Sequence, residues 1–159
     1  MPRVLLTGMS ATGKSTVLRE LVLRGIRVVD ADDEGWSMEV DAPDGSGVEQ
    51  VWIENRMAAL LEEPASDPVV VAGCASNQGH FYVEFDAVVL LRVPVDVMLQ
   101  RLEARTTNDF GKRPGERERI LADLELVEPV LRATATCELD GTRPVAELAD
   151  EVEWLARGS

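Results

Sequence analysis

The chain has 159 residues and a mass of 17.4 kDa, which is the size of one domain with a single hydrophobic core. Its 29 acidic residues and 16 lysines and arginines give a formal net charge of −13, which disfavours nucleic acid as a partner and favours a small molecule. No apolar run is long enough to cross a membrane, so we expect a cytoplasmic protein whose two cysteines are free thiols.

Apolar strand-like runs alternate with helical stretches along the whole chain, a pattern typical of a parallel α/β sheet between two layers of helices. The predicted strands are residues 3–7, 26–30, 69–72, 87–93 and 136–139. The predicted helices are residues 14–24, 48–63, 95–105, 116–133 and 144–156, and residues 41–47 are expected to form a solvated loop. We expect one domain over residues 1–159.

After the first strand, residues 8–16 read G-M-S-A-T-G-K-S-T and match the phosphate-binding pattern G-x-x-x-x-G-K-[ST] without substitution. The glycines allow tight turns that direct backbone N–H groups at a phosphate, and the positive end of the following helix dipole points at the same anion. Lys14 adds a positive charge for the outer phosphates, and Ser15 offers a hydroxyl to Mg²⁺. The predicted nucleotide-binding residues of this loop are Gly8, Ser10, Ala11, Thr12, Gly13, Lys14, Ser15 and Thr16.

The second strand ends in V-V-D-A-D, which brings Asp30 and Asp32 to the carboxyl edge of the sheet, where ligands bind in open α/β folds. Residues two apart on an extended chain face the same side. Asp30 is then a ligand of Mg²⁺, and Asp32 orients or deprotonates an acceptor hydroxyl. The alternative is that both carboxylates cap the N-terminus of a following helix.

The third strand runs into a small, polar loop, residues 73–79, which suits a polyhydroxylated or heterocyclic acceptor. Gly73 and Asn77 are the predicted acceptor-binding residues of this loop, and a simple connection is the alternative. Arg56 either directs its guanidinium at the acceptor or lies on a solvated helix face. Trp36 and Trp52 either form a wall of the acceptor site or pack in the core.

Three further arginines are predicted to act on the nucleotide. Residues 106–115 are polar and glycine-rich, so closure of this segment would bring Lys112 and Arg113 onto the phosphates; an exposed basic loop is the alternative. Arg105 is expected to stack on the adenine. Arg143, after the last strand, is expected to belong to the other wall of the base site.

Trp154 and Cys74 are expected to pack in the core.

Together, G-M-S-A-T-G-K-S, D-A-D, the glycine-bearing loop after the third strand and R-T-T-N-D-F-G-K-R-P resemble the shikimate kinase and gluconate kinase branch of the nucleoside monophosphate kinase-like P-loop proteins. The resemblance implies a three-layer P-loop NTPase fold with a five-stranded parallel sheet in the order 2-3-1-4-5. It also implies an acceptor-binding region at about residues 32–64 and a short lid at about residues 106–119.

The same resemblance implies roles for individual residues. Lys14 and Ser15 would bind ATP and Mg²⁺, with Asp30 supporting the metal. Asp32 would contact the acceptor hydroxyl, Arg56 would bind an acidic acceptor, and Arg113 would be the arginine of the lid's Arg-Pro pair. The chain departs from shikimate kinases after the third strand, where G-C-A replaces their Gly-Gly-Gly run.

The sequence therefore predicts an ATP-dependent kinase for a hydroxyl of a small metabolite, a nucleoside or an antibiotic-like sugar. One alternative is a nucleoside monophosphate kinase, whose acceptor phosphate calls for several arginines where this chain has only Arg56 between residues 30 and 71. The other is a regulatory nucleotide-binding module that hydrolyses ATP slowly and signals through a partner.

Overall fold

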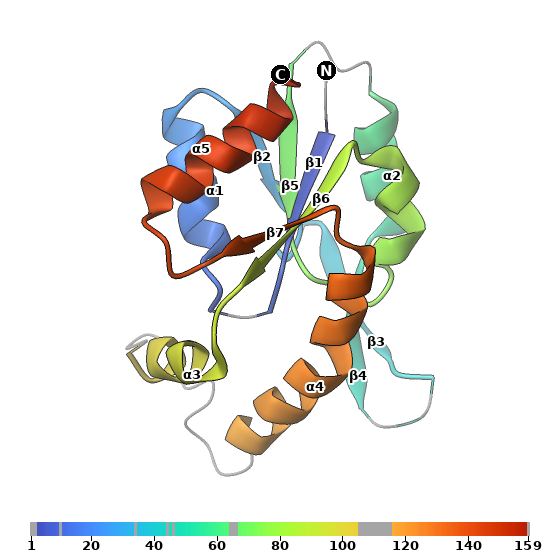
Figure 1. The fold of residues 1–159 in the computed structure, drawn as a ribbon. Helices are drawn as coiled ribbons and strands as arrows, with labels where there is room; N and C mark the ends of the chain where they lie inside the picture. Colours follow the sequence, from blue (N-terminus) through green and yellow to red (C-terminus); the bar gives the residue numbers. More distant parts are fainter. Residues whose placement is uncertain are drawn as a thin grey trace.

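A five-stranded parallel sheet forms the centre of the computed structural model (Figure 1). The structure describes residues 3–9, 11–33, 35–43, 45, 47–63, 67–104 and 116–158, with only the backbone described at residues 116, 117 and 119. The strands of this sheet are β1 (Arg3–Thr7), β2 (Arg27–Asp30), β5 (Val69–Ala72), β6 (Ala87–Arg92) and β7 (Cys137–Asp140). Their order is β2-β5-β1-β6-β7, which is the predicted 2-3-1-4-5 order, so the predicted fold class is confirmed.

Helices cover both faces of this sheet. They are α1 (Lys14–Leu23), α2 (Glu54–Glu62), α3 (Val95–Ala104), α4 (Glu116–Thr134) and α5 (Val145–Ala156), with a 3₁₀ helix, η1 (Gln78–Glu84). α1 and α5 pack together on one face, while α2 and η1 lie on the other (Figure 1).

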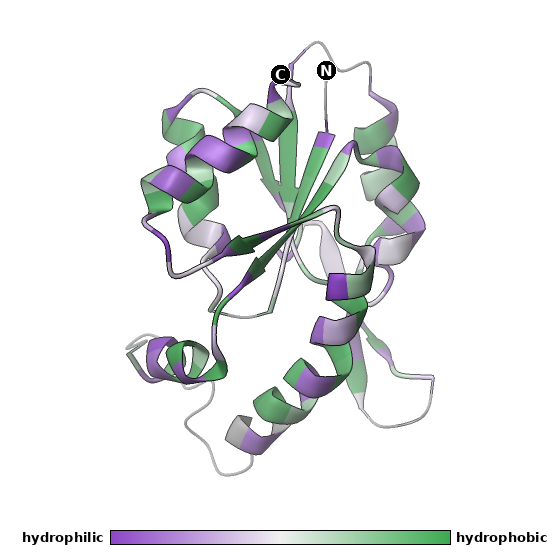
Figure 2. Ribbon diagram, in the orientation of Figure 1, coloured by the Kyte–Doolittle hydropathy of each residue, from purple (hydrophilic) through white to green (hydrophobic). Residues whose placement is uncertain are grey.

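Alternation along β1 divides the core between the two faces. Val4 and Leu6 belong to the cluster under α1 and α5, whereas Leu5 belongs to the cluster under α2 and η1. All three side chains are fully buried, and the strands form the continuous apolar centre seen in Figure 2. Trp154 was expected in the core, but on α5 it is 59% exposed, so that prediction was wrong.

A two-stranded hairpin replaces part of a predicted helix. β3 (Ser37–Asp41) and β4 (Val48–Trp52) pair antiparallel, so the helix expected over residues 48–63 begins only at Glu54. Valine and tryptophan favour strands, and pairing with β3 satisfies the backbone of β4. Gly47, at φ 137°, follows the turn, and its carbonyl accepts a hydrogen bond from Ala42 N at 2.8 Å. The stretch read as a solvated loop is therefore the tip of a hairpin.

Among the helices that the structure describes, none combines the length and the apolar character that a membrane crossing requires.

Candidate functional site

The loop between β1 and α1 is tightly folded against β6. A Cβ added to Gly8 would lie 2.4 Å from the carbonyl oxygen of Leu91, so only glycine fits there. Ala11, with φ 64°, is the one non-glycine residue in the described part of the chain that has a positive φ. Thr12 Oγ1 donates a hydrogen bond to the Met9 carbonyl at 2.8 Å and helps to hold this turn.

The N-terminus of α1 begins at this loop without a side-chain cap. Its N-cap residue, Gly13, has no side chain to bond to the first turn, and that turn contains no acidic residue. The Lys14 ammonium lies across the loop and donates to the carbonyl oxygens of Gly8 at 2.6 Å and Met9 at 3.0 Å. Ser15 and Thr16 are exposed beside it. These features suit the binding of an anion, and the predicted Ser10 lies outside the described residues.

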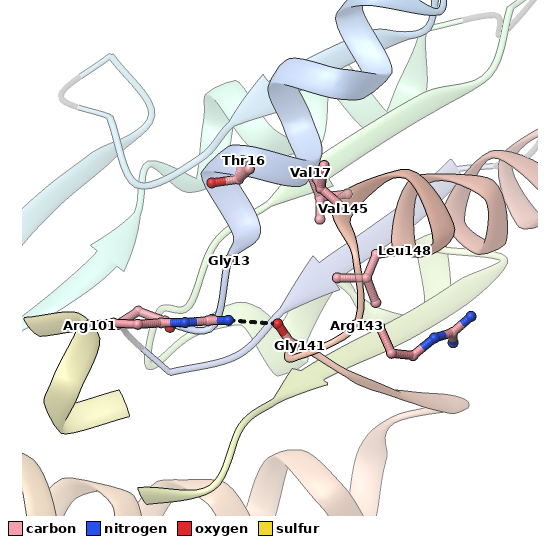
Figure 3. A pocket seen from close by; sticks show the side chains of 9 residues that line it. Gly13, Thr16, Val17, Arg101, Gly141, Arg143, Val145 and Leu148 are labelled. Atoms are coloured by element: carbon pink, nitrogen blue, oxygen red, sulfur yellow. Dashed lines mark hydrogen bonds between the residues drawn. The ribbon is translucent and has the colours of Figure 1, made fainter. Parts of the chain in front are cut away.

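A pocket of about 420 Å³ adjoins this loop between α1, α3 and the turn from β7 to α5 (Figure 3). Arg101, on α3, crosses it: Nη1 donates to Ala11 O at 3.0 Å and Nη2 donates to Gly141 O at 2.9 Å. Gly141 packs so closely that an added Cβ would lie 2.5 Å from Thr12 O. The pocket is lined by Ala11, Gly13, Thr16, Val17, Arg101, Gly141, Arg143, Val145 and Leu148.

Arg101 was not predicted from the sequence, where its only signal is its place one helical turn before Arg105. Arg105 itself, together with Lys112 and Arg113 of the expected lid, lies outside the described residues. Arg143 lines the pocket as expected, but its Nη2 forms ion pairs with Glu147 at 3.5 Å and Glu151 at 3.8 Å on α5.

A carboxylate stands at the same edge of the sheet, directly after β2. Asp32 Oδ1 accepts hydrogen bonds from Cys74 N at 3.0 Å and from Gln50 Nε2 at 2.9 Å. Asp30 Oδ1 accepts one from Asp32 N at 3.2 Å. The next element is the strand β3, so the alternative that these two carboxylates cap a helix is wrong.

Burial sets the protonation of the groups around Asp32. Although Asp32 is open to solvent on one side, desolvation raises the pKa of its carboxyl above 3.8, while the Cys74 N–H bond and the Lys14 charge lower it. Burial likewise raises the pKa of the Cys74 thiol above 9.0, against the effect of Lys14. Cys74 is therefore a neutral thiol at pH 7, and its environment does not favour a nucleophile. The charge of Lys14 therefore acts on both side chains.

Gly73 packs tightly against the side chains of Asp32 and Trp52. A Cβ built on it would lie 2.9 Å from Asp32 Oδ1 and 3.1 Å from Trp52 Nε1. Trp52 is 1% exposed, and its Nε1 is the one buried side-chain nitrogen or oxygen in the described part of the chain without a hydrogen-bond partner. Its N–H does not meet hydrogen-bond geometry with Asp32, yet Trp52 lowers the pKa of that carboxyl, after the larger effects of the Cys74 N–H and the Lys14 charge.

Two predicted acceptor-binding side chains have partners within the protein. The Asn77 amide bonds to the backbone of Trp52 on both sides, accepting from its N–H at 2.9 Å and donating to its carbonyl at 3.0 Å. Arg56 donates to the Gly35 carbonyl, and its guanidinium lies 4.6 Å from the centroid of the Trp36 ring. Both side chains therefore brace the base of the hairpin.

Gln78, a polar residue of the loop that was expected to suit an acceptor, is buried. Its Nε2 donates to Thr7 Oγ1 at 3.0 Å and to the Tyr82 hydroxyl at 2.8 Å, and its Oε1 accepts from Ala75 N at 2.9 Å. This network ties the end of β1 to the loop after β5. Only its position after Asn77 in a polar loop could have drawn attention to it.

Two oxygen donors of the kind that Mg²⁺ prefers follow the carboxyl ends of β1 and β2. The exposed Ser15 hydroxyl and the half-buried Asp30 carboxylate are hard ligands, and Mg²⁺ commonly binds one or two such groups together with phosphates and water. The described residues contain no group of three or more His, Cys, Asp or Glu side chains able to hold a metal by themselves. The donor set fits a metal that arrives with a nucleotide.

Comparison with known proteins agrees with this geometry. A family model described as AAA domain matches residues 4–122, which is most of the chain. No curated protein matches. Among solved structures, shikimate kinase from Acinetobacter baumannii in complex with shikimate is similar at 23% identity and a TM-score of 0.66, over 98% of this chain and 92% of that one.

Two other solved structures share the fold at lower identity. A sugar kinase from Janibacter sp. HTCC2649 has 20% identity and a TM-score of 0.59, over 98% of this chain and 94% of that one. Deoxyadenosine kinase from M. mycoides with bound dATP has 11% identity and a TM-score of 0.60, over 98% of this chain and 100% of that one. At these identities the likeness shows the fold alone.

Proposed function

Because the chain belongs to the AAA domain family, we propose that it is an ATP-dependent phosphotransferase that moves the γ-phosphoryl group to a hydroxyl of a small molecule. The kinases among its structural neighbours support this class of reaction. We extend the proposal to one domain over residues 1–159, with the acceptor region at about residues 32–64 and the lid at about residues 106–119.

One observation carries the proposal: Asp32 lies close enough to Lys14 for the charge of the lysine to act on its carboxyl. Lys14 belongs to the phosphate loop, and its charge lowers the pKa of the Asp32 carboxyl against a larger effect of burial. Asp32 is fixed by the Cys74 N–H and the Gln50 amide. A carboxylate held beside a phosphate-binding lysine is suited to accept a proton from a hydroxyl that attacks the γ-phosphorus.

The other proposed roles concern binding of the phosphates, the metal and the nucleoside. The backbone of residues 8–16 and the start of α1 would hold the phosphates, while Lys14 stabilises the charge of the group in transfer. Ser15 and Asp30 would hold Mg²⁺, which supplies positive charge to the phosphate oxygens when bound. The pocket crossed by Arg101 is assigned to the nucleoside, with Arg143 at its wall. Arg113 is assigned to the lid.

Asp32 would then take the hydroxyl proton as the acceptor oxygen bonds to phosphorus and the bond to the ADP oxygen breaks. Gly73 belongs to the acceptor side, because only glycine fits beside Asp32 and Trp52 at this position. Arg56 and Asn77 serve that side indirectly, since both hold the hairpin that carries Gln50. With Arg56 engaged in this way, residues 30–71 offer no other arginine for the phosphate of a nucleoside monophosphate acceptor.

The direct test is a screen of small hydroxylated compounds with Mg-ATP, measuring ADP release above the rate without acceptor. We expect at least one acceptor to stimulate release. Lys14→Met should abolish this stimulation, whereas Arg27→Met, which removes an exposed cation paired with Glu63 at the start of β2, should preserve it. Slow release that no acceptor changes would instead identify a regulatory NTPase.

A further inference from the structure

The pairing between β1 and β5 ends just before the candidate site. Leu6 and Ala72 are the last residues in register between these strands, and one further backbone hydrogen bond follows, from Gly73 N to Leu6 O at 3.1 Å. Beyond that point, β1 runs into the phosphate loop at residues 8–16, whereas β5 runs into the loop at residues 73–79. Strand pairing therefore does not extend to the parts of these two loops that form the site.

The Gln78 side chain joins the two loops where the strand pairing has ended. Its Nε2 donates to Thr7 Oγ1 at 3.0 Å, and its Oε1 accepts from Ala75 N at 2.9 Å. The other Nε2 proton goes to the Tyr82 hydroxyl at 2.8 Å. Gln78 is 3% exposed and Thr7 is fully buried, so water does not compete for the bond between them. Because every polar group of this buried amide is bonded, the network fixes one arrangement of the side chain.

Each end of this bridge lies one residue from a group of the proposed site. Thr7 directly precedes the phosphate loop, residues 8–16. Ala75 directly follows Cys74, whose N–H donates to Asp32 Oδ1 at 3.0 Å. The bridge therefore relates the position of the Asp32 carboxylate to that of the phosphate loop.

From this bridge we propose that Gln78 is a positioning residue for phosphoryl transfer: it sets where the Asp32 carboxylate stands relative to the phosphate loop. The proposal rests on the proposed function, which makes Asp32 the base. A base must lie within hydrogen-bond reach of the attacking hydroxyl, and a displacement of about 1 Å can lower the rate by about 10²-fold. All three bonds of the Gln78 amide go to the protein, so it acts through the Cys74 N–H and not on the substrate.

The kinetic test is Gln78→Met, which keeps the length of the side chain but removes both ends of the bridge. We expect kcat with a stimulating acceptor to fall by about 10- to 100-fold, while KM for ATP stays within about twofold of the parent value. The stoichiometry of ATP-analogue binding gives the folded fraction, to which kcat is normalised. Thr7→Val breaks the bridge from its other end and should lower kcat in the same direction, also if Gln78→Met does not fold.

Tyr82→Phe is the matched control within the same network. The bond that it removes lies inside η1, between residues four apart, and does not join the two loops. We expect kcat of this variant to stay within about twofold of the parent value. A loss equal to that of Gln78→Met would mean that the network as a whole matters and would refute the assignment of the bridge.

A double-mutant cycle with Asp32→Asn separates positioning from a structural role. If Gln78 acts through Asp32, adding Gln78→Met to Asp32→Asn should lower kcat by less than about twofold more, because the group that Gln78 positions is already gone. The same 10- to 100-fold loss in both backgrounds, or an unchanged kcat for Gln78→Met alone, would overturn the proposal.

The parent protein distinguishes this proposal from the proposed function. If no acceptor stimulates ADP release by the parent, the proposed function fails and the role of Gln78 fails with it. If Asp32→Asn abolishes stimulated release and Gln78→Met retains it, only the role of Gln78 fails.

Discussion

Replacing Asp32 with asparagine should separate activity from stability, because the proposed function makes this carboxylate the base for transfer while its burial is a cost to the fold. The amide oxygen of asparagine can keep both hydrogen bonds that Oδ1 accepts, from Cys74 N at 3.0 Å and Gln50 Nε2 at 2.9 Å. Loss of a general base lowers the rate by about 10²- to 10⁴-fold, which corresponds to about 2.7–5.5 kcal/mol in the barrier. We expect that loss in kcat with the nucleotide affinity preserved.

The stability of Asp32→Asn should change in the opposite direction. Burial raises the pKa of Asp32 in the folded state, so the contribution of Asp32 to stability is complete below pH 3.8 and is lost as the pH rises through the folded value. The variant, which cannot ionise, escapes that loss and should be more stable than the parent at pH 7.

Urea unfolding at a series of pH values from about pH 4 to about pH 8 measures this difference. The free-energy advantage of the variant should shrink toward zero at the acidic end of the series. An advantage that grows as the pH falls, or a variant that is less stable at pH 7, would refute the reasoning about burial. Unchanged kcat would refute the role of Asp32 as a base.

Three further substitutions test the architecture of the site. Gly8→Ala forces a Cβ to 2.4 Å from the Leu91 carbonyl oxygen, so it should lower the free energy of unfolding by about 1–3 kcal/mol and remove most of the affinity for an ATP analogue. Calorimetry measures both losses. Gly79→Ala is the control and should be neutral, because an added Cβ there meets nothing within 4 Å. Asn77→Ala unpairs the N–H and carbonyl of Trp52 and should cost about 2–3 kcal/mol in urea unfolding, against less than about 0.5 kcal/mol for the exposed Asn55→Ala. Arg101→Ala removes the hydrogen bonds from Arg101 to the carbonyls of Ala11 and Gly141, so it should raise KM for ATP by about tenfold. Gln100→Ala, at an exposed position, should leave KM unchanged. An unchanged KM for Arg101→Ala would show that the pocket does not bind the nucleoside.

Much of the fold was predictable because it depends on patterns that are local in the sequence. The buried strands are uninterrupted apolar runs. The phosphate loop is a contiguous motif, and its glycines are required by the local backbone geometry. The hairpin was missed because V-E-Q-V-W continues without a break into the helix that starts at Glu54. This stretch forms a strand because it pairs with β3, and that pairing is not visible in the local sequence.

The candidate site shows the same division. The position of Asp32 follows directly from the end of the strand, and the structure brings it close enough to Lys14 for the lysine charge to act on its carboxyl. Asn77 and Arg56 are predicted to bind the acceptor because their side chains suit a polar ligand, but in the structure both side chains bind the protein's own backbone. Arg101 bridges two segments that are distant in sequence, so no local pattern identifies it.

The central claim is that the γ-phosphoryl group of ATP is transferred to a carbon-bound hydroxyl. Phosphorus NMR of the protein with Mg-ATP and a stimulating acceptor follows that group directly. The account predicts a phosphate-ester resonance that grows in step with ADP and is absent with Lys14→Met. ADP that forms together with inorganic phosphate alone would contradict it.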